Sequence, residues 1–239
     1  MVCSPGEAAQ VLITRPEPGA SDTAARIAAM GMVPVVAPVF ATRLVETVLP
    51  ACDAIASVLV TSGSALAALP ATYHGLTLLA VGDVTAARAR AAGFQNVVSA
   101  SGDSTDLAAL AKEQLRPEAG ALLLAVGRFQ ANALADDLRA AGFRVLRRVV
   151  YSTIPARTLA PTAMAALRNG TVRAALFFSA ETARHFVQLV RRARVGTSVR
   201  TVEAISIGQP AAVALGRLPW RRISVAARPN QDEMLALLR

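Results

Sequence analysis

The residues of this chain that could do chemistry are few, and the first is a tyrosine at the end of a short apolar segment. Tyr151 stands in VLRRVVYST, residues 145–153, and the other tyrosine, Tyr73, lies in the loop-like stretch PATYHG. A phenol has a pKa of about 10, so at neutral pH it can donate a proton. Most tyrosines in strands are packing residues with the hydroxyl at the wet rim. The position therefore indicates either a packing residue or a proton donor.

Four turns rich in glycine and hydroxyl residues form a second group. Each follows a strand-like segment: TRPEPGAS near the N-terminus, TSGSA at 61–65, VGDVTA at 81–86 and FSAET at 178–182. Free backbone N–H groups at the start of a helix favour an anion. The same residues also serve as ordinary helix caps. Four such turns at equivalent positions favour a ligand with several anionic groups.

Other classes of site lack their sequence patterns. The chain has no G-x-G-x-x-G or G-x-x-x-x-G-K-[ST] loop and no convincing Ser-His-Asp or paired-carboxylate arrangement. His74 and His185 are isolated, and Cys3 and Cys52 have neither disulfide nor metal-ligand spacing. The sequence therefore disfavours enzymes with a phosphate-cradling loop and predicts no structural metal.

The charge of the chain is uneven. Residues 140–239 carry 16 arginines against 4 acidic residues, whereas residues 1–139 carry 9 basic and 12 acidic residues, which gives the net charge of +9. Arginine bias can reflect a GC-rich genome. A basic half also attracts anions and offers bidentate partners to carboxylates and phosphates. The anion could be nucleic acid, a membrane surface or a polyanionic small molecule.

The elements that must position these residues occur twice. Three segments align with later ones: 11–43 with 122–154, 58–69 with 175–186, and 80–100 with 206–226. Each copy alternates strand-length apolar runs with Ala-rich amphipathic segments. This pattern predicts an α/β protein with two similar doubly wound parallel-sheet domains. Ligands of such sheets bind beyond the carboxyl ends of the strands, so a shared ligand is expected in a cleft between the two.

The composition predicts a well-filled core, since 54% of the residues are hydrophobic and 17% are charged. The longest uncharged stretch, 54–82, is interrupted by polar residues and does not predict a membrane-spanning helix. The N-terminal MVCSPGEAAQ has no secretory signal pattern. We expect a soluble, cytoplasmic protein.

The ordered set of motifs resembles the uroporphyrinogen-III synthase family. The likeness rests on LITRP, LVTSGSA, LLAVGDVTAARARAAGF, AAGFRVLRRVVYST, ALFFSAETARHF and AISIGQPAAVAL with ISVAARPNQDEMLALL. These segments follow the family's order and span the chain from about Val11 to Leu238. The resemblance implies a crossed topology, with one domain built from residues 1–40 and 155–239 and the other from 41–154. Two linkers, 37–43 and 148–155, would join them as a pair of strands.

The resemblance also implies a reaction. The family's substrate is hydroxymethylbilane, a linear tetrapyrrole with eight carboxylates, which a cofactor-independent lyase cyclises with loss of water and inversion of ring D. Tyr151 matches a family tyrosine in the VY-T context, which implies that it assists loss of the hydroxyl. The positions matching the family's substrate-facing residues are Thr14, Arg15, Ser62, Gly63, Ser64, Thr85, Arg128, Ser179, Ala180 and Gln209. The expected partner is this small-molecule polycarboxylate, bound by a monomer without nucleic acid or membrane.

The chain departs from the family pattern at two places. In IGQPAA, Pro210 and Ala211 offer no hydroxyl where the family often has a threonine, and Ala131 stands where it often has an arginine. Arg128 is the nearest substitute for that charge. One alternative is therefore a non-catalytic relative that binds tetrapyrroles. A second is a nucleic-acid-binding α/β protein, which the basic half suggests. The second lacks a helix-turn-helix pattern or a basic stripe interleaved with aromatics.

Overall fold

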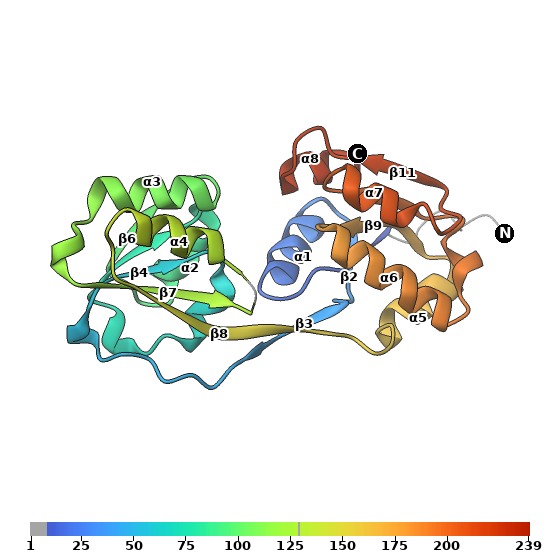
Figure 1. Ribbon diagram of the computed structural model, residues 1–239. Helices are drawn as coiled ribbons and strands as arrows, with labels where there is room; N and C mark the ends of the chain where they lie inside the picture. Colours follow the sequence, from blue (N-terminus) through green and yellow to red (C-terminus); the bar gives the residue numbers. More distant parts are fainter. Residues whose placement is uncertain (1–8, 129) are drawn as a thin grey trace. The chain divides into compact units, whose positions relative to one another are not determined.

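The computed structural model describes residues 9–128 and 130–239, so Cys3 lies outside the described residues. The chain divides into two compact units. Unit 1 holds the chain up to Ala41 together with Ile154–Arg239, and unit 2 holds Thr42–Thr153. Each unit contains one sheet with helices on both faces (Figure 1), which confirms the predicted α/β class with parallel sheets.

Within the described residues, the sheet of unit 1 has five strands in the order β11-β10-β9-β1-β2, and all four pairs of neighbours are parallel. The strands are β1 (Gln10–Ile13), β2 (Val33–Val36), β9 (Val172–Phe177), β10 (Glu203–Ser206) and β11 (Arg222–Val225). The central strands are almost continuous apolar runs because helices cover them on both sides. Five of the six residues of β9 are buried.

Five α-helices cover this sheet. They are α1 (Gly19–Ala29), α5 (Pro161–Asn169), α6 (Ala180–Arg192), α7 (Gln209–Leu215) and α8 (Gln231–Ala236), with a short 3-10 helix, η5 (Gly196–Val199). The apolar faces of α5, α6 and α7 pack on one side of the sheet, and those of α1 and α8 pack on the other. α6 shows why: Phe186, Val187 and Val190 recur at helical spacing and are all buried.

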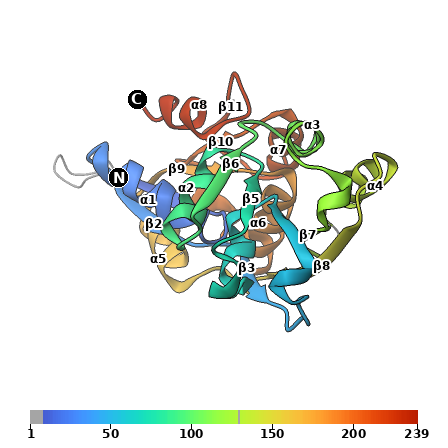
Figure 2. The ribbon, with the colours of Figure 1, turned by 90° about the vertical axis from the view of Figure 1, so that its left-hand side faces the viewer.

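Unit 2 has six strands in the order β3-β8-β7-β4-β5-β6. They are β3 (Phe40–Leu44), β4 (Ile55–Val60), β5 (Thr77–Ala80), β6 (Asn96–Ser99), β7 (Ala121–Gly127) and β8 (Val145–Pro155). Its helices are α2 (Asp83–Ala91), α3 (Ser104–Gln114) and α4 (Asn132–Ala140), with 3-10 turns η1 (Cys52–Ala54), η2 (Gly63–Ala68), η3 (Ala71–Tyr73) and η4 (Pro117–Ala119). α2 and η2 pack on one face of the sheet and α3 and α4 on the other (Figures 1 and 2).

The two units repeat one strand order. β11-β10-β9-β1-β2 of unit 1 corresponds to β6-β5-β4-β7-β8 of unit 2, as the sequence alignment pairs them. The segments after β4 and β9 differ: the first is the 3-10 helix η2, whereas its counterpart is the α-helix α6. Pro70 follows η2 closely, and the residue before a proline is disfavoured in the α conformation.

The two chain crossings between the units run along neighbouring strands, β3 and β8. The amide of Val45 donates to the carbonyl of Val150, and the amide of Ala156 donates to the carbonyl of Val39. From Val39 to Val45 the partner moves back from Ala156 to Val150, so these two strands are antiparallel. Within the described residues, no helix is both long enough and apolar enough to span a membrane.

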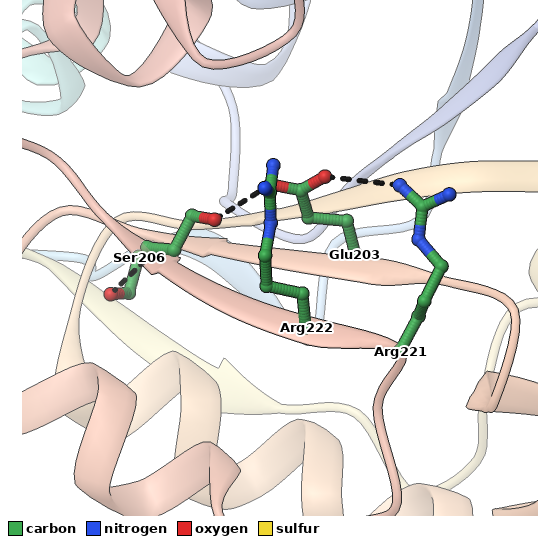
Figure 3. A network of polar contacts seen from close by, with 5 residues as sticks. Glu203, Ser206, Arg221 and Arg222 are labelled. Atoms are coloured by element: carbon green, nitrogen blue, oxygen red, sulfur yellow. Dashed lines mark hydrogen bonds and ion pairs between the residues drawn. The ribbon is translucent and has the colours of Figure 1, made fainter.

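A buried carboxylate joins the last two strands of unit 1 (Figure 3). Glu203 in β10 is 5% exposed. Its Oε1 accepts hydrogen bonds from Arg222 Nη2 at 2.6 Å and from Ser224 Oγ at 2.6 Å, and its Oε2 accepts from Arg221 Nη2 at 3.2 Å. Burial acts to raise the pKa of Glu203, but the hydrogen bonds from Ser224 and the two arginines outweigh it and hold the pKa below its ordinary value.

Candidate functional site

The parallel strands bring most of the predicted site residues to the carboxyl edge of one sheet or the other. In unit 2, β4 ends before Ser62, Gly63 and Ser64, β5 ends before Thr85, and β7 ends before Arg128. In unit 1, β1 leads into Thr14 and Arg15, β9 into Ser179 and Ala180, and β10 into Gln209. Each unit therefore gathers one subset of these residues at a single edge, where ligands of doubly wound sheets bind.

Tyr151 reaches the edge of unit 2 through an irregularity in strand pairing. Val126 of β7 pairs with Val149 of β8, but Gly127 pairs with Tyr151, so Val150 is an extra residue. Such a bulge changes the direction of the side chains that follow. The amide of Arg128 donates to the carbonyl of Tyr151 at 3.0 Å, which continues the pairing past the bulge.

The phenol of Tyr151 is buried and hydrogen-bonded. Its side chain is 3% exposed, and its hydroxyl donates to Oε1 of Gln130 at 2.7 Å. Burial raises the pKa of Tyr151 above its ordinary value of 10.0, while hydrogen bonds with the Ser62 and Gln130 side chains and the Gly127 backbone act in the opposite direction. At neutral pH the group is therefore a protonated phenol, which can donate a proton but cannot act as a base.

A hollow of about 390 Å³ opens beside this phenol. It is lined by Thr61, Ser62, Ser104, Gln130, Ala131 and Tyr151. The lining offers hydroxyl and carboxamide groups but no carboxylate, so nothing in it repels an anion. Ala131 adopts the left-handed conformation, with φ of 57°, and directly precedes α4. Ala131, where the resemblance implies an arginine, thus lies in the wall of this hollow.

The turn after β4 presents a second polar surface in unit 2. Ser62 caps the start of η2, and its Oγ accepts a hydrogen bond from the amide of Ser64 at 3.2 Å. A Cβ atom on Gly63 would lie 3.0 Å from Cδ and 3.1 Å from Nη1 of Arg88, so the arginine of α2 lies across the glycine. No sequence pattern indicates Arg88, because its contact depends on the packing of α2 against the turn.

Two other predicted residues of unit 2 have different surroundings. Thr85 is buried in the first turn of α2, with 8% of its surface exposed. Gly82, which precedes this helix, provides no side-chain cap. The side chain of Arg128 is exposed. Of the predicted residues, the hollow therefore contains Ser62 and Tyr151. It adds Thr61, which belongs to the predicted turn 61–65, and Ser104 and Gln130, which the sequence did not indicate.

In unit 1, Thr14 and Arg15 make contacts with other residues of the same unit. Thr14 is fully buried, and its hydroxyl donates to the carbonyl of Leu176 at 2.6 Å, so that hydroxyl links two strands. The guanidinium of Arg15 lies 4.2 Å from the ring centre of Phe178 and donates to Oε1 of Gln231 at 3.1 Å. These contacts fix the direction of the Arg15 side chain.

The start of α6 is capped by a hydroxyl. Ser179 Oγ accepts from the amide of Thr182 at 3.0 Å and donates to its Oγ1 at 2.9 Å. Ala180 is the first residue of α6, and Gln209 is the first residue of α7. The capping role that the sequence left open for these turns is present at Ser179, and its predicted contact with substrate stays a prediction.

Comparison with known proteins places the chain in a family. A family model described as uroporphyrinogen-III synthase HemD matches residues 21–236. The chain belongs to the uroporphyrinogen-III synthase family. Family membership makes the protein an enzyme of haem biosynthesis with a small-molecule tetrapyrrole substrate. A search of curated proteins found no match.

One solved structure agrees with this assignment at the level of the fold, and a second is less similar. The uroporphyrinogen-III synthetase of Helicobacter pylori 26695 aligns with a TM-score of 0.60 at 15% identity, covering 96% of this chain and 98% of that one. A mutant uroporphyrinogen III synthase from the extremely thermophilic bacterium Thermus thermophilus aligns with a TM-score of 0.48 at 21% identity over 97% of each chain. The first of these supports the α/β fold of the family.

The two departures from the family pattern have defined places in the structure. Ala131 lines the hollow beside Tyr151. Ala211 is 1% exposed and belongs to the buried face of α7, so it supports the helix from within. Pro210 occupies the first turn of α7, where a proline is accommodated without losing a helical hydrogen bond. Neither departure disturbs the elements of the fold.

Proposed function

We propose that the protein cyclises hydroxymethylbilane to uroporphyrinogen III and that Tyr151 donates the proton that lets the hydroxyl leave. The observation that supports this role is a protonated phenol, 3% exposed, in the wall of a polar hollow at the carboxyl edge of the unit 2 sheet. The match to the synthase family covers this part of the chain.

The first step needs an acid. The hydroxyl on the methylene of ring A leaves as water, the C–O electron pair departs with the oxygen, and the pyrrole nitrogen supplies electrons to form an azafulvenium cation. Hydroxide is a poor leaving group, so a positioned donor accelerates the step. Burial favours the neutral phenol of Tyr151, which keeps that proton available at neutral pH.

Positioning decides which isomer forms. Ring D attacks the cation through its substituted carbon to give a spiro-pyrrolenine, and fragmentation followed by reclosure inverts ring D. Free in solution, the substrate closes without inversion to the type I isomer. The enzyme must therefore hold a flexible chain in one ring-closing pose. A hollow of about 390 Å³ is smaller than a tetrapyrrole, so it would hold only one end of the substrate.

The substrate's eight carboxylates give the remaining predicted residues their proposed task. They would be bound by hydroxyls, by backbone amides at the helix starts and by arginine side chains. The predicted substrate-binding set is Thr14, Arg15, Ser62, Gly63, Ser64, Thr85, Arg128, Ser179, Ala180 and Gln209. The positive charge concentrated in residues 140–239 would also raise the local concentration of a polycarboxylate.

The finer parts of the proposal come from the family resemblance. The reaction class is that of a lyase, and the closure of the ring needs no cofactor because no electrons are exchanged with another compound. The protein would act as a monomer in the cytoplasm on this small molecule, without nucleic acid as a partner. Gel filtration tests the monomer, and mobility of labelled DNA at low salt tests the last point.

The test is an isomer assay. Hydroxymethylbilane is generated in situ, the purified protein is added, the products are oxidised, and type I and type III porphyrins are separated by chromatography. Predominantly type III product is expected. If the folded protein gave only type I at the spontaneous rate, the proposal would be refuted, and a protein that binds tetrapyrroles without turnover would be the remaining explanation.

A further inference from the structure

The hydroxyl of Tyr151 has a partner in the hollow that belongs to no predicted set. It donates to Oε1 of Gln130 at 2.7 Å, and both residues line the same space. The side chain of Gln130 is exposed, whereas Tyr151 is buried. The carboxamide therefore lies between the phenol and solvent, where a ligand entering the hollow meets it first.

The position of Gln130 is fixed by the strand that carries Tyr151. Its backbone carbonyl accepts hydrogen bonds from Nε and Nη2 of Arg147 at 3.1 and 2.8 Å. Its amide donates to the carbonyl of Gly127 at 3.2 Å. Arg147 and Tyr151 both belong to β8, so one strand holds the backbone of Gln130 through the arginine and its side chain through the phenol.

The space that the carboxamide and the ring share exists because residue 127 is a glycine. A Cβ atom there would lie 2.8 Å from Oε1 of Gln130 and 2.8 Å from Cζ of Tyr151. Both distances are shorter than any ordinary contact of a Cβ atom, so an added methyl group would displace one of the two groups. Gly127 therefore keeps open the space in which the phenol of Tyr151 meets the carboxamide of Gln130.

We infer that Gln130 is a positioning residue, which holds the proton of Tyr151 toward the hollow until the departing hydroxyl of the substrate replaces the carboxamide as acceptor. The inference rests on the proposed function. A carboxamide suits this task because it both accepts and donates hydrogen bonds. Its oxygen accepts from the phenol before transfer, and its NH₂ group can donate to the phenolate after transfer.

The proton balance of this step closes without another reactant. The O–H bond of Tyr151 breaks, its proton joins the departing hydroxyl, and the C–O electron pair leaves with that oxygen as water. The cyclisation removes water overall, so a hydrogen must also leave ring D as the macrocycle closes. The phenolate of Tyr151 takes up that proton and is ready for the next turnover.

The hydrogen bond itself can be tested without substrate, because the chain contains only two tyrosines. Protein labelled with ¹³C at Cζ of tyrosine gives one resonance for each, and Tyr151→Phe assigns them. Gln130→Ala is expected to move the Tyr151 resonance and leave that of Tyr73 in place. The matched control is Gln114→Ala, an exposed glutamine of α3, which should move neither. An unmoved Tyr151 resonance in Gln130→Ala would overturn the inference.

Turnover provides the second readout. Gln130→Ala is expected to lower kcat roughly three- to tenfold, the effect of one hydrogen bond, with KM unchanged. Gln130→Glu should lower kcat further, since a carboxylate cannot donate to the phenolate and its charge opposes ionisation of Tyr151. Gln130→Ala should have no further effect in a Tyr151→Phe background, because the two residues act as one unit.

Failure of this inference is distinguishable from failure of the proposed function. If the wild-type protein made type III product and Gln130→Ala had the same kcat, the positioning role would be refuted while the synthase activity stood. The positioning role would also be refuted if the effects of Gln130→Ala and Tyr151→Phe simply added. If the wild-type protein made only type I product, the proposed function would be refuted, and the inference that rests on it would be refuted as well.

Discussion

Tyr151 of β8 lies opposite Gly127 of β7 at the position where the register between these strands shifts. Val150 is passed over in the pairing, so the tyrosine takes the place opposite the glycine. A Cβ atom on Gly127 would lie 2.7 Å from Cε2 of the ring. The location of the phenol therefore depends on two features together: an extra residue in one strand and a missing side chain in the other.

Gly127→Ala tests this relationship. The added methyl group must displace the ring or its carboxamide partner, and overpacking of this kind costs about 1–3 kcal/mol. We expect urea unfolding to show that loss and the isomer assay to show a smaller share of type III product. Gly75→Ala is the matched control, because a Cβ there meets no atom within 4 Å. Equal behaviour of the two variants would contradict the role given to Gly127.

Substitution by phenylalanine should affect catalysis at Tyr151 and stability at Tyr73. Tyr151→Phe removes the proposed proton donor, so turnover should fall about 10²-fold, at the low end for general acids because the ring also closes unaided. Slower catalysis leaves more substrate to spontaneous closure, so type I product should rise. Binding of substrate and the free energy of unfolding should change little, since Gln130 is exposed and Ser62 is half-buried, so water can take the place of the lost hydroxyl beside both side chains.

Tyr73→Phe is the counterpart of that variant. The hydroxyl of Tyr73 donates to the carbonyl of Pro50, and its side chain is 1% exposed. Its loss leaves a carbonyl without this partner and should lower the free energy of unfolding by about 1 kcal/mol. The ratio of type III to type I should stay that of the wild type. A change in isomer ratio for Tyr73→Phe with no change for Tyr151→Phe would reverse the assignment of the two phenols.

Much of the fold could be predicted from the sequence because it depends on local patterns that occur twice. The alignment of 11–43 with 122–154 makes β1 equivalent to β7, and the alignment of 80–100 with 206–226 makes β6 equivalent to β11. Apolar runs bounded by glycine and hydroxyl turns also place most of the candidate residues after strands. Residues that follow parallel strands share one sheet edge, so the two edges follow from the pattern alone.

The rest of the site depends on contacts between distant residues. Gln130 reaches Tyr151 because the register between β7 and β8 shifts at Gly127. No residue type in either strand predicts that shift. The resemblance implies that Thr14 faces the substrate, whereas the structure buries it fully and directs its hydroxyl to the carbonyl of Leu176, 162 residues away. Arg88 lies over Gly63 through the packing of α2. The residue type at a single position does not indicate which distant residue it will contact.

The buried carboxylate of unit 1 predicts an acid-sensitive stability. The pKa of Glu203 in the folded protein is below its ordinary value of 4.5, so its ion pairs stabilise the fold above that pH. The contribution disappears as pH falls through the lower, folded-state pKa. Glu203→Gln should therefore reduce the free energy of unfolding at neutral pH by about 2 kcal/mol, somewhat below the usual cost of breaking a buried pair, because both arginines are more than half exposed.

Trp220 provides the measurement, since it is the only tryptophan and packs on Phe177 and Phe186 in unit 1. Urea unfolding followed by its fluorescence should show the difference between wild type and Glu203→Gln narrowing as the pH is lowered below about 4.5. Asp232→Asn is the control, because its ion pair with Arg26 is exposed and contributes little. A difference that did not change with pH would mean that ionisation of Glu203 is not its source.

Ser179 allows the two interpretations of the glycine and hydroxyl turns to be separated. As a cap, its Oγ accepts from the amide of Thr182, so Ser179→Ala should lower the stability of unit 1 by about 1 kcal/mol. Ser179→Asp restores an equally good cap and adds a negative charge at the start of α6. If a substrate carboxylate binds there, KM for hydroxymethylbilane should rise roughly tenfold in the aspartate variant while stability stays near that of the wild type.

Gln188→Glu is the control, because this exposed position later in the same helix adds the same charge away from the helix start and should leave KM unchanged. An aspartate variant with wild-type KM would show that this turn only caps its helix and would remove Ser179 from the proposed substrate-binding set.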